Sequence, residues 1–244
     1  ELFQVLAPPC TVFNEVYLVT ELCDADLHTV INSDTPLSED HVQFFAYHIL
    51  RALLYLHSAN VVHRDLKPMN VLVMKNCDIK ICDFGLARGR AGFDREDDEW
   101  LRTEYVGTRW YRAPEVVLTS SEYTAAIDMW SVGCILGELM GRKVMFKGSD
   151  FIDQIHTICS ILGTPEASEL SFIPEENSAA RSFIQNRFGY MPPQDLRVLY
   201  PEACESQCDL LEQLVRFDPN KRPSACEALR HPYLDDLHDE DDEP

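Results

Sequence analysis

The chain has 244 residues, of which 45% are hydrophobic and 25% are charged, and its formal net charge is -20. This composition is typical of a globular protein with one large core or two small ones. The acidic balance argues against general binding to nucleic acid or anionic membranes and permits basic protein partners. No apolar run approaches the length of a membrane span, and no signal peptide is visible.

The nine cysteines are scattered along the chain. Only Cys77 and Cys82, or Cys204 and Cys208, lie close together, and neither pair has the spacing of a zinc ribbon. Reduced thiols are typical of the cytosol and nucleus. We therefore expect a protein of the cytoplasm and nucleus.

The first sixty residues predict short strands and one long helix. An apolar run over 2–7 is followed by prolines, and the β-branched and aromatic residues of 16–19 predict a strand. Residues 26–31 suit a short helix. Ser38 is a good N-cap, and apolar residues then follow helical spacing to about Ser58.

The stretch 61–70 carries an unusual set of polar residues between two apolar runs. Val61-Val62 and Val71-Leu72-Val73 indicate short strands, so the polar residues lie on a connecting loop. That loop holds Asp65, Lys67 and Asn70 within reach of one point. A carboxylate base, a cation for phosphate oxygens and an amide ligand for a metal suit phosphoryl transfer.

A second metal candidate follows a predicted hairpin. Residues 71–73 and 79–81 indicate its two strands, and the second strand leads to Asp83. Mg²⁺ prefers hard oxygen ligands, which Asn70 and Asp83 together supply. From Asp83 to Glu115 there is little regular pattern, and loops of that length are usually functional or disordered.

The second half of the chain is mainly helical. A nearly apolar stretch over 124–140 predicts a buried central helix, in which Asp128 needs hydrogen-bond partners. Further helices are expected over 151–162 and 210–217, and after the capping box that begins at Ser224. Residues 166–201 look irregular. The expected fold class is thus α+β, mainly α, with a few short strands near the polar loop.

These motifs together resemble the eukaryotic protein kinases. His63-Arg64-Asp65 with Asn70 matches a kinase catalytic loop, and Asp83-Phe84-Gly85 matches the metal-binding tripeptide that follows it. The run from Thr103-Glu104-Tyr105 to Ala113-Pro114-Glu115 is similar to the activation segment of mitogen-activated protein (MAP) kinases with Glu between the two hydroxyl residues. The resemblance implies a protein-kinase-like fold: a large helical C-lobe with short β-hairpins and a remnant of the N-lobe.

The resemblance also implies roles for residues at matching positions. Asp65 would accept the proton of a substrate Ser or Thr hydroxyl, with Lys67 on the moving phosphoryl group and Thr108 beside both. Asn70 and Asp83 would hold Mg²⁺. The ATP adenine would meet the gatekeeper Thr20, the backbone of Glu21 and Cys23, and the side chain of Leu72.

Further positions would form a phosphorylation switch. Thr103 and Tyr105 would be phosphorylated by an upstream dual-specificity MAP kinase kinase. Arg64 would sense the first phosphate, and Arg109 and Arg112 the second, since arginine binds phosphate with two hydrogen bonds. Three residues are expected to be structural: Asp128 under the catalytic loop, and Glu115 paired with Arg222.

The last ten residues, 235–244, include seven acids. An acidic end is usually solvated or disordered. In MAP kinases, however, a segment of this kind binds the basic docking motifs of substrates and phosphatases. The resemblance therefore favours a common-docking tail in which Asp239, Asp242 and Glu243 make the main contacts.

The resemblance divides the chain into a kinase domain over 1–234 and the tail. Residues 1–23 would be the N-lobe remnant and hinge, and residues 24–234 the C-lobe. No glycine-rich loop or strand lysine precedes Val16. Because the chain does not start with Met, we expect a fragment of an active kinase whose residues 1–244 alone turn over ATP weakly. The alternative is a truncated, catalytically dead docking module.

A metal-dependent phosphatase or other hydrolase is a third class of enzyme. It would need a denser cluster of carboxylates and histidines than this sequence contains. The favoured function is ATP- and Mg²⁺-dependent phosphorylation of Ser or Thr, before proline by resemblance alone.

Overall fold

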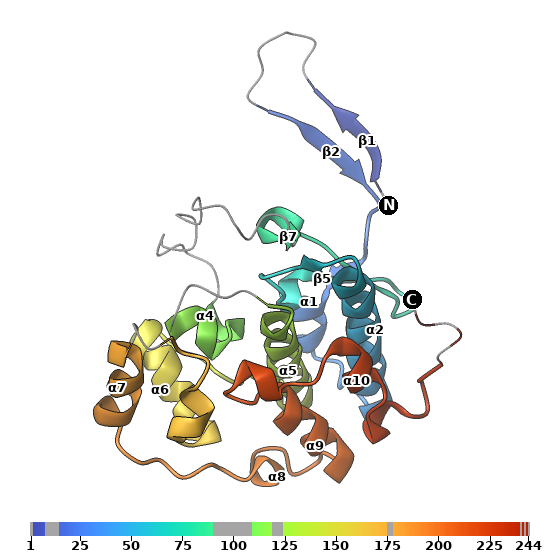
Figure 1. Ribbon diagram of the computed structural model, residues 1–244. Helices are drawn as coiled ribbons and strands as arrows, with labels where there is room; N and C mark the ends of the chain where they lie inside the picture. Colours follow the sequence, from blue (N-terminus) through green and yellow to red (C-terminus); the bar gives the residue numbers. More distant parts are fainter. Residues whose placement is uncertain are drawn as a thin grey trace.

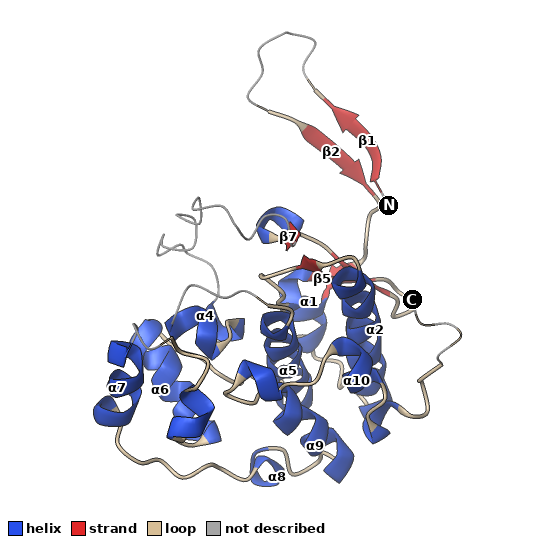
Figure 2. Cartoon of the chain, viewed as in Figure 1, coloured by secondary structure: helices blue, strands red, loops and turns tan. Residues whose placement is uncertain are grey.

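The computed structural model describes residues 2–7, 15–89, 109–118, 124–174, 178–239, 241 and 243. Figure 1 shows a body of helices from which one β-hairpin projects, and Figure 2 shows how few strands the body contains. The predicted class, mainly α with short sheets, is confirmed.

The strands form three small antiparallel sheets within the described residues. The projecting hairpin pairs β1 (Leu2–Leu6) with β2 (Tyr17–Thr20). The predicted hairpin pairs β5 (Val71–Val73) with β6 (Ile79–Ile81), and the other side of β5 pairs with a short third strand. The remaining strands are β3 (Ala25–Asp26), β4 (Val61–Val62) and β7 (Arg88–Gly89), of which β4 pairs with β7. A small sheet thus lies at each end of the polar loop: β4 with β7 before it, and β5 with its two partners after it.

Helices form most of the body. The α-helices of the described residues are α1 (Leu27–Ile31), α2 (Glu39–Ser58), α4 (Pro114–Leu118), α5 (Ala126–Gly141), α6 (Phe151–Leu162), α7 (Ser178–Arg187), α8 (Leu196–Leu199), α9 (Glu205–Leu214) and α10 (Ala225–Leu229). Among these residues, no helix combines the length and hydropathy that a membrane crossing requires. Short 3₁₀ turns connect them at η1 (Pro68–Asn70), η2 (Phe84–Leu86), η4 (Arg109–Tyr111), η5 (Ala167–Leu170), η7 (Pro219–Lys221) and η8 (Pro232–Leu234).

The capping chemistry explains where the predicted helices begin. The Ser38 hydroxyl accepts from the backbone N–H of His41, and α2 then runs to Ser58 as the sequence predicted. Ser224 caps α10 in the same way through Glu227. Helix α6 has its predicted bounds.

Two predictions about the second half were wrong. Residues 166–201 are not irregular throughout, because they contain η5, α7 and α8. Helix α9 starts five residues before the predicted Leu210 and ends at Leu214. Its first turns bury Gln207 and Cys208, so a search for apolar periodicity missed them.

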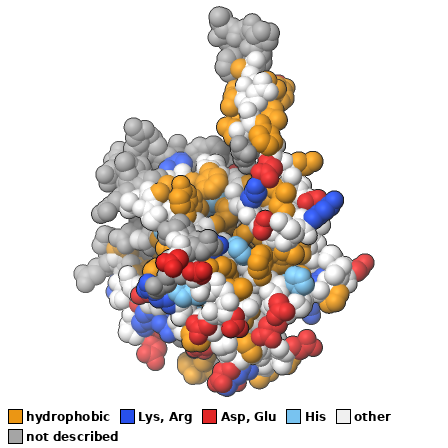
Figure 3. Space-filling view, turned by 90° about the vertical axis from the view of Figure 1, so that its right-hand side faces the viewer, with side chains coloured by type: hydrophobic (Ala, Val, Ile, Leu, Met, Phe, Trp, Pro, Cys, Tyr) orange, Lys and Arg blue, Asp and Glu red, His pale blue; other side chains and the backbone are white. Residues whose placement is uncertain are grey.

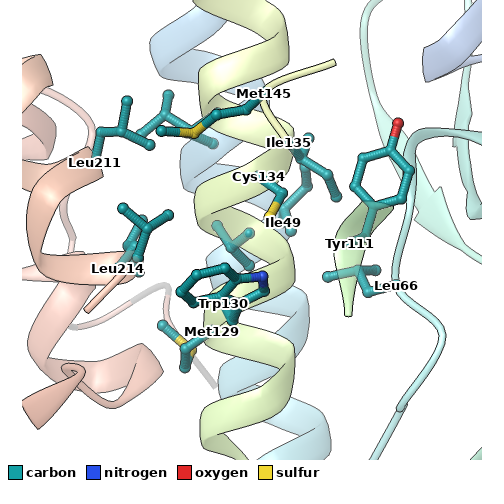
Figure 4. Packing of buried hydrophobic residues seen from close by; sticks show 14 of the residues in the cluster. Ile49, Leu66, Tyr111, Met129, Trp130, Cys134, Ile135, Met145, Leu211 and Leu214 are labelled. Carbon is teal, nitrogen blue, oxygen red and sulfur yellow. The ribbon is translucent and has the colours of Figure 1, made fainter. Parts of the chain in front are cut away.

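Helix α5 is the centre of the core. Trp130 is fully buried on it and stacks on Phe146, whose ring centroid lies 5.3 Å away. Figure 4 shows α5 with α9 on one side and Leu66 and Tyr111 on the other. The polar loop therefore rests on the most buried helix of the protein, which fixes its position.

Candidate active site

The catalytic-loop residues converge as the sequence predicted. The Lys67 ammonium lies 2.6 Å from the Asp65 carboxylate, and both side chains are mostly buried. The Asn70 amide nitrogen donates to the Asp65 carbonyl at 2.8 Å. Strands β4 and β5 hold the ends of the loop, and Pro68 opens the 3₁₀ turn that brings Asn70 back to Asp65.

Asp128 of α5 holds this loop from below. Its fully buried carboxylate accepts from the backbone N–H groups of His63 and Arg64, each at 2.9 Å, and from the His57 ring at 2.9 Å. Arg64 has a left-handed backbone, with φ of 68°. Because such a conformation is strained for arginine, the hydrogen bond at its N–H helps to maintain it.

The segment that carries Asp83 is tied to the same loop. The backbone N–H of Cys82 donates to the Asn70 carbonyl at 2.9 Å. The fully buried His63 ring lies 3.0 Å from the Cys82 carbonyl and packs edge-on against Phe84. Asp83 itself is exposed and has a left-handed backbone, with φ of 64°. The two predicted Mg²⁺ ligands, Asn70 and Asp83, thus lie on neighbouring backbone segments that are joined by a hydrogen bond.

The donor set at this position fits a divalent cation. The Asn70 nitrogen faces Asp65, so its amide oxygen, the atom that ligates hard cations, points away from that residue. A Cβ on Gly85 would lie 3.2 Å from an Asp83 carboxylate oxygen, so glycine leaves this carboxylate room. The described residues contain no cluster of three or more His, Cys, Asp or Glu side chains suited to a metal.

The residues of the predicted adenine site lie at the end of β2, in the segment that connects β2 to β3, and on β5. Thr20 ends β2 and is exposed, while Glu21, Cys23 and Leu72 are half-buried. The Glu21 carboxylate lies 2.5 Å from the Lys80 ammonium of β6. This hydrogen bond lowers the pKa of Glu21 below its usual value. The pair joins the backbone that would face adenine to the hairpin carrying Leu72.

Two of the three predicted phosphate-sensing arginines come together. Arg64 and Arg112 line a cavity of about 30 Å³ beside Asp65. Arg109 does not share it: one of its nitrogens donates to the Ser149 carbonyl at 2.5 Å, and its guanidinium lies 5.4 Å from the centre of the Phe151 ring. The expectation that Arg109 and Arg112 together meet phosphorylated Tyr105 stays a prediction. Residues Thr103, Tyr105 and Thr108 lie outside the described part of the chain.

The expected structural ion pair is present. The Arg222 guanidinium donates to both Glu115 oxygens, at 2.6 and 2.7 Å, and lies over the Trp130 ring. Both charged side chains are almost fully buried. The pair joins α4, which contains the end of the predicted activation segment, to the segment before α10.

The acidic tail departs from its prediction at Glu243. Asp239 is exposed and Asp242 lies outside the described residues, but the Glu243 side chain is only 8% exposed. Its carboxylate accepts from the Tyr47 hydroxyl at 3.2 Å and meets the His238 ring at 2.7 Å. Both contacts fall on its Oε1 atom, which is therefore engaged within the chain.

Sequence reasoning missed several of these contributors. None of Lys80, Tyr47, His238 and His57 belongs to a motif that the sequence reveals. The buried hydrogen bond from Tyr111 to Glu138, at 2.5 Å, was also not foreseen. The one available signal was the polar Glu138 on the apolar face of a central helix, which calls for a partner.

Comparison with known proteins agrees with this geometry. A family model described as the protein kinase domain matches residues 6–234. The chain belongs to the protein kinase domain family. It is 51% identical to mitogen-activated protein kinase 6 of Oryza sativa subsp. japonica and 50% identical to mitogen-activated protein kinase 4 of Arabidopsis thaliana, each over 95% of its length. It is also 50% identical to extracellular signal-regulated kinase 1 of Dictyostelium discoideum over the same share.

The kinase domain seen here is shorter than these relatives. The chain covers 59% of the length of the rice and Arabidopsis proteins and 42% of the Dictyostelium protein. The similarity is to MAP kinases in each case, which supports the resemblance inferred from the activation segment.

Proposed function

We propose that the chain forms the catalytic part of a MAP kinase that transfers the γ-phosphate of ATP to Ser or Thr of protein substrates, before proline. The observation that carries the proposal is the contact between Lys67 and Asp65 at 2.6 Å, with Asn70 bound to the same residue. A base, a cation and a metal ligand at one point supply what phosphoryl transfer needs.

Each residue has a defined part in the proposed reaction. Asp65 accepts the proton of the substrate hydroxyl, and Lys67 stabilises the negative charge on the transferred phosphoryl group. Asn70 and Asp83 would hold Mg²⁺, which would supply positive charge to neutralise the ATP phosphates. Asp128 keeps the loop in place through the His63 and Arg64 backbone and does not touch substrate.

We further propose that dual phosphorylation of Thr103 and Tyr105 by an upstream MAP kinase kinase activates the protein, which acts in the cytoplasm and nucleus. Arg64 and Arg112 both lie beside Asp65, which supports a link between a phosphate that they bind and the base. The acidic tail would bind substrates and phosphatases that carry basic docking motifs, with an affinity that falls as salt rises.

A phosphotransfer assay tests this function. The purified protein is treated with a dual-specificity kinase kinase and then given ATP, Mg²⁺ and a Ser-Pro peptide, with a Ser-Ala peptide as control. For residues 1–244 alone we expect weak transfer to the Ser-Pro peptide, and only after treatment, with a further loss of roughly 10²–10⁴-fold in Asp65→Asn.

The same assay separates the alternative function. A docking module would bind a Lys/Arg-rich peptide in a salt-sensitive way yet transfer no phosphate before or after treatment. Transfer that is equally fast in Asp65→Asn would contradict the proposed role of the base.

A further inference from the structure

The C-terminal tail turns back onto helix α2. After η8, the backbone N–H groups of Leu237 and His238 both donate to the Leu234 carbonyl, at 2.9 and 3.0 Å, which reverses the chain. The N–H of Glu243 then donates to the Asp239 carbonyl at 3.1 Å. The far end of this turn reaches Tyr47 in the middle of α2. Figure 1 shows the C-terminus returning to the side of this helix.

The contact with α2 is buried. Tyr47 is 4% exposed, and the side chains of Glu243 and His238 are 8% and 17% exposed. Burial raises the pKa of the Tyr47 hydroxyl, and its hydrogen bond to Glu243 adds to that rise. Arg51, one turn further along α2, lies 5.7 Å from the centre of the Tyr47 ring. The Glu243 carboxylate thus belongs to a packed polar cluster rather than to the surface.

Other acids of the same turn face solvent. Asp239 and Asp241 are exposed, and the Asp241 N–H donates to an Asp239 carboxylate oxygen at 3.0 Å. Figure 3 shows the side of the molecule on which the tail lies, with groups of acidic side chains over its lower part. A basic side chain can approach these two carboxylates without breaking any contact with α2.

We propose that Glu243 anchors the acidic tail to α2 through Tyr47 and His238, and that this anchor presents Asp239 and Asp241 to a Lys/Arg-rich peptide. Glu243 is therefore a positioning residue. Tyr47 and His238 both contact its Oε1 atom, and breaking these contacts would cost the hydrogen bonds that hold the tail against α2. The peptide part of this inference rests on the proposed docking function.

Glu243 could hold the tail against α2 or touch the peptide directly, and these two roles predict different results for Tyr47→Phe. This variant removes one hydroxyl that faces Glu243 and keeps the buried ring. If Glu243 is an anchor, losing that hydroxyl releases the tail and weakens binding; if Glu243 touches the peptide, Tyr47→Phe has no effect. Tyr55→Phe is the matched control, because Tyr55 lies on the same helix and is 63% exposed.

The experiment uses the whole chain and two measurements. Amide hydrogen exchange of the tail reports the anchor, and fluorescence anisotropy with a synthetic Lys/Arg-rich peptide reports binding. We expect Tyr47→Phe and Glu243→Gln each to speed tail exchange and to weaken binding by roughly three- to tenfold. The double variant should be no worse than Glu243→Gln, because that change already disturbs the contact that Tyr47 makes.

Three results would decide against the proposal or separate its parts. Unchanged tail exchange in both variants overturns the anchor. Weaker binding in Glu243→Gln without faster tail exchange makes Glu243 a peptide contact and also overturns it. If the unaltered chain binds no basic peptide, the docking function fails, while faster tail exchange in Tyr47→Phe still supports the anchor.

Discussion

At the scale of single residues, the site depends on buried carboxylates with assigned partners. Asp128 accepts three hydrogen bonds, and Glu115 pairs with Arg222. Removing one partner of a buried carboxylate costs more free energy of folding than the pair contributes, because the remaining buried group is left without a hydrogen bond. These residues therefore set the positions of neighbours that do the chemistry.

Glu138 supplies a prediction about pH. It is 2% exposed, and desolvation raises its pKa above the usual 4.5, although the Tyr111 hydroxyl opposes the rise. The folded state thus holds this proton more tightly than the unfolded state. Relative to Glu138→Gln, the native chain should be most stable below pH 4.5 and lose that advantage as pH rises through the folded-state pKa.

Urea unfolding of both proteins between about pH 4 and pH 8 measures this difference. A difference in the free energy of unfolding that stays constant, or that grows with pH, would contradict it.

At the scale of elements, close approach between helices fixes the frame. A Cβ on Gly133 of α5 would lie 2.6 Å from a Val215 methyl and 3.0 Å from the Leu214 Cβ. Helix α9 can pack this closely because α5 carries no side chain there. The same contact places Asp128, on the preceding turn of α5, under the catalytic loop.

Gly133→Ala should therefore destabilise the protein. Overpacking costs about 1–3 kcal/mol, and the better helix propensity of alanine offsets about 1 kcal/mol of it. We expect a net loss of up to about 2 kcal/mol in urea unfolding.

Gly189→Asn is the control for this prediction. Nothing lies within 4 Å of a Cβ there, and asparagine tolerates its φ of 64°. An equal loss of unfolding free energy in both variants would mean that the effect of Gly133→Ala does not come from the α5–α9 contact.

At the scale of the whole molecule, the projecting hairpin is the exception to a well-packed body. Every residue of β1 and β2 is exposed. The large apolar side chains concerned are 39–64% exposed: Leu2, Phe3, Val5, Leu6, Val16, Tyr17, Leu18 and Val19. An isolated hairpin is marginally stable in water, and apolar patches of this kind mediate association.

Residues 1–244 should accordingly self-associate through this hairpin. Leu18→Lys, at a position 64% exposed, should shift the chain toward monomer in light-scattering measurements. Tyr190→Lys is the control, because Tyr190 is 84% exposed but lies far along the chain from the hairpin. A native chain that stays monomeric at high concentration would refute the prediction.

Local sequence patterns were enough to predict α2 and the loop around Asp65. Ser38 and the apolar spacing after it specified α2, and Pro68 and the apolar runs on either side of Asp65 specified a loop between strands. These features follow from local rules of capping, periodicity and proline geometry, which act over a few residues.

Only the tertiary structure decided what the side chains meet. Asp128 contacts a backbone 64 and 65 residues away, and Glu243 meets a tyrosine 196 residues away. Arg109 turns to Ser149 and Phe151 instead of sharing a cavity with Arg112. Such choices depend on which distant segments bury each polar group, because a buried charge takes whatever partner the fold brings within reach.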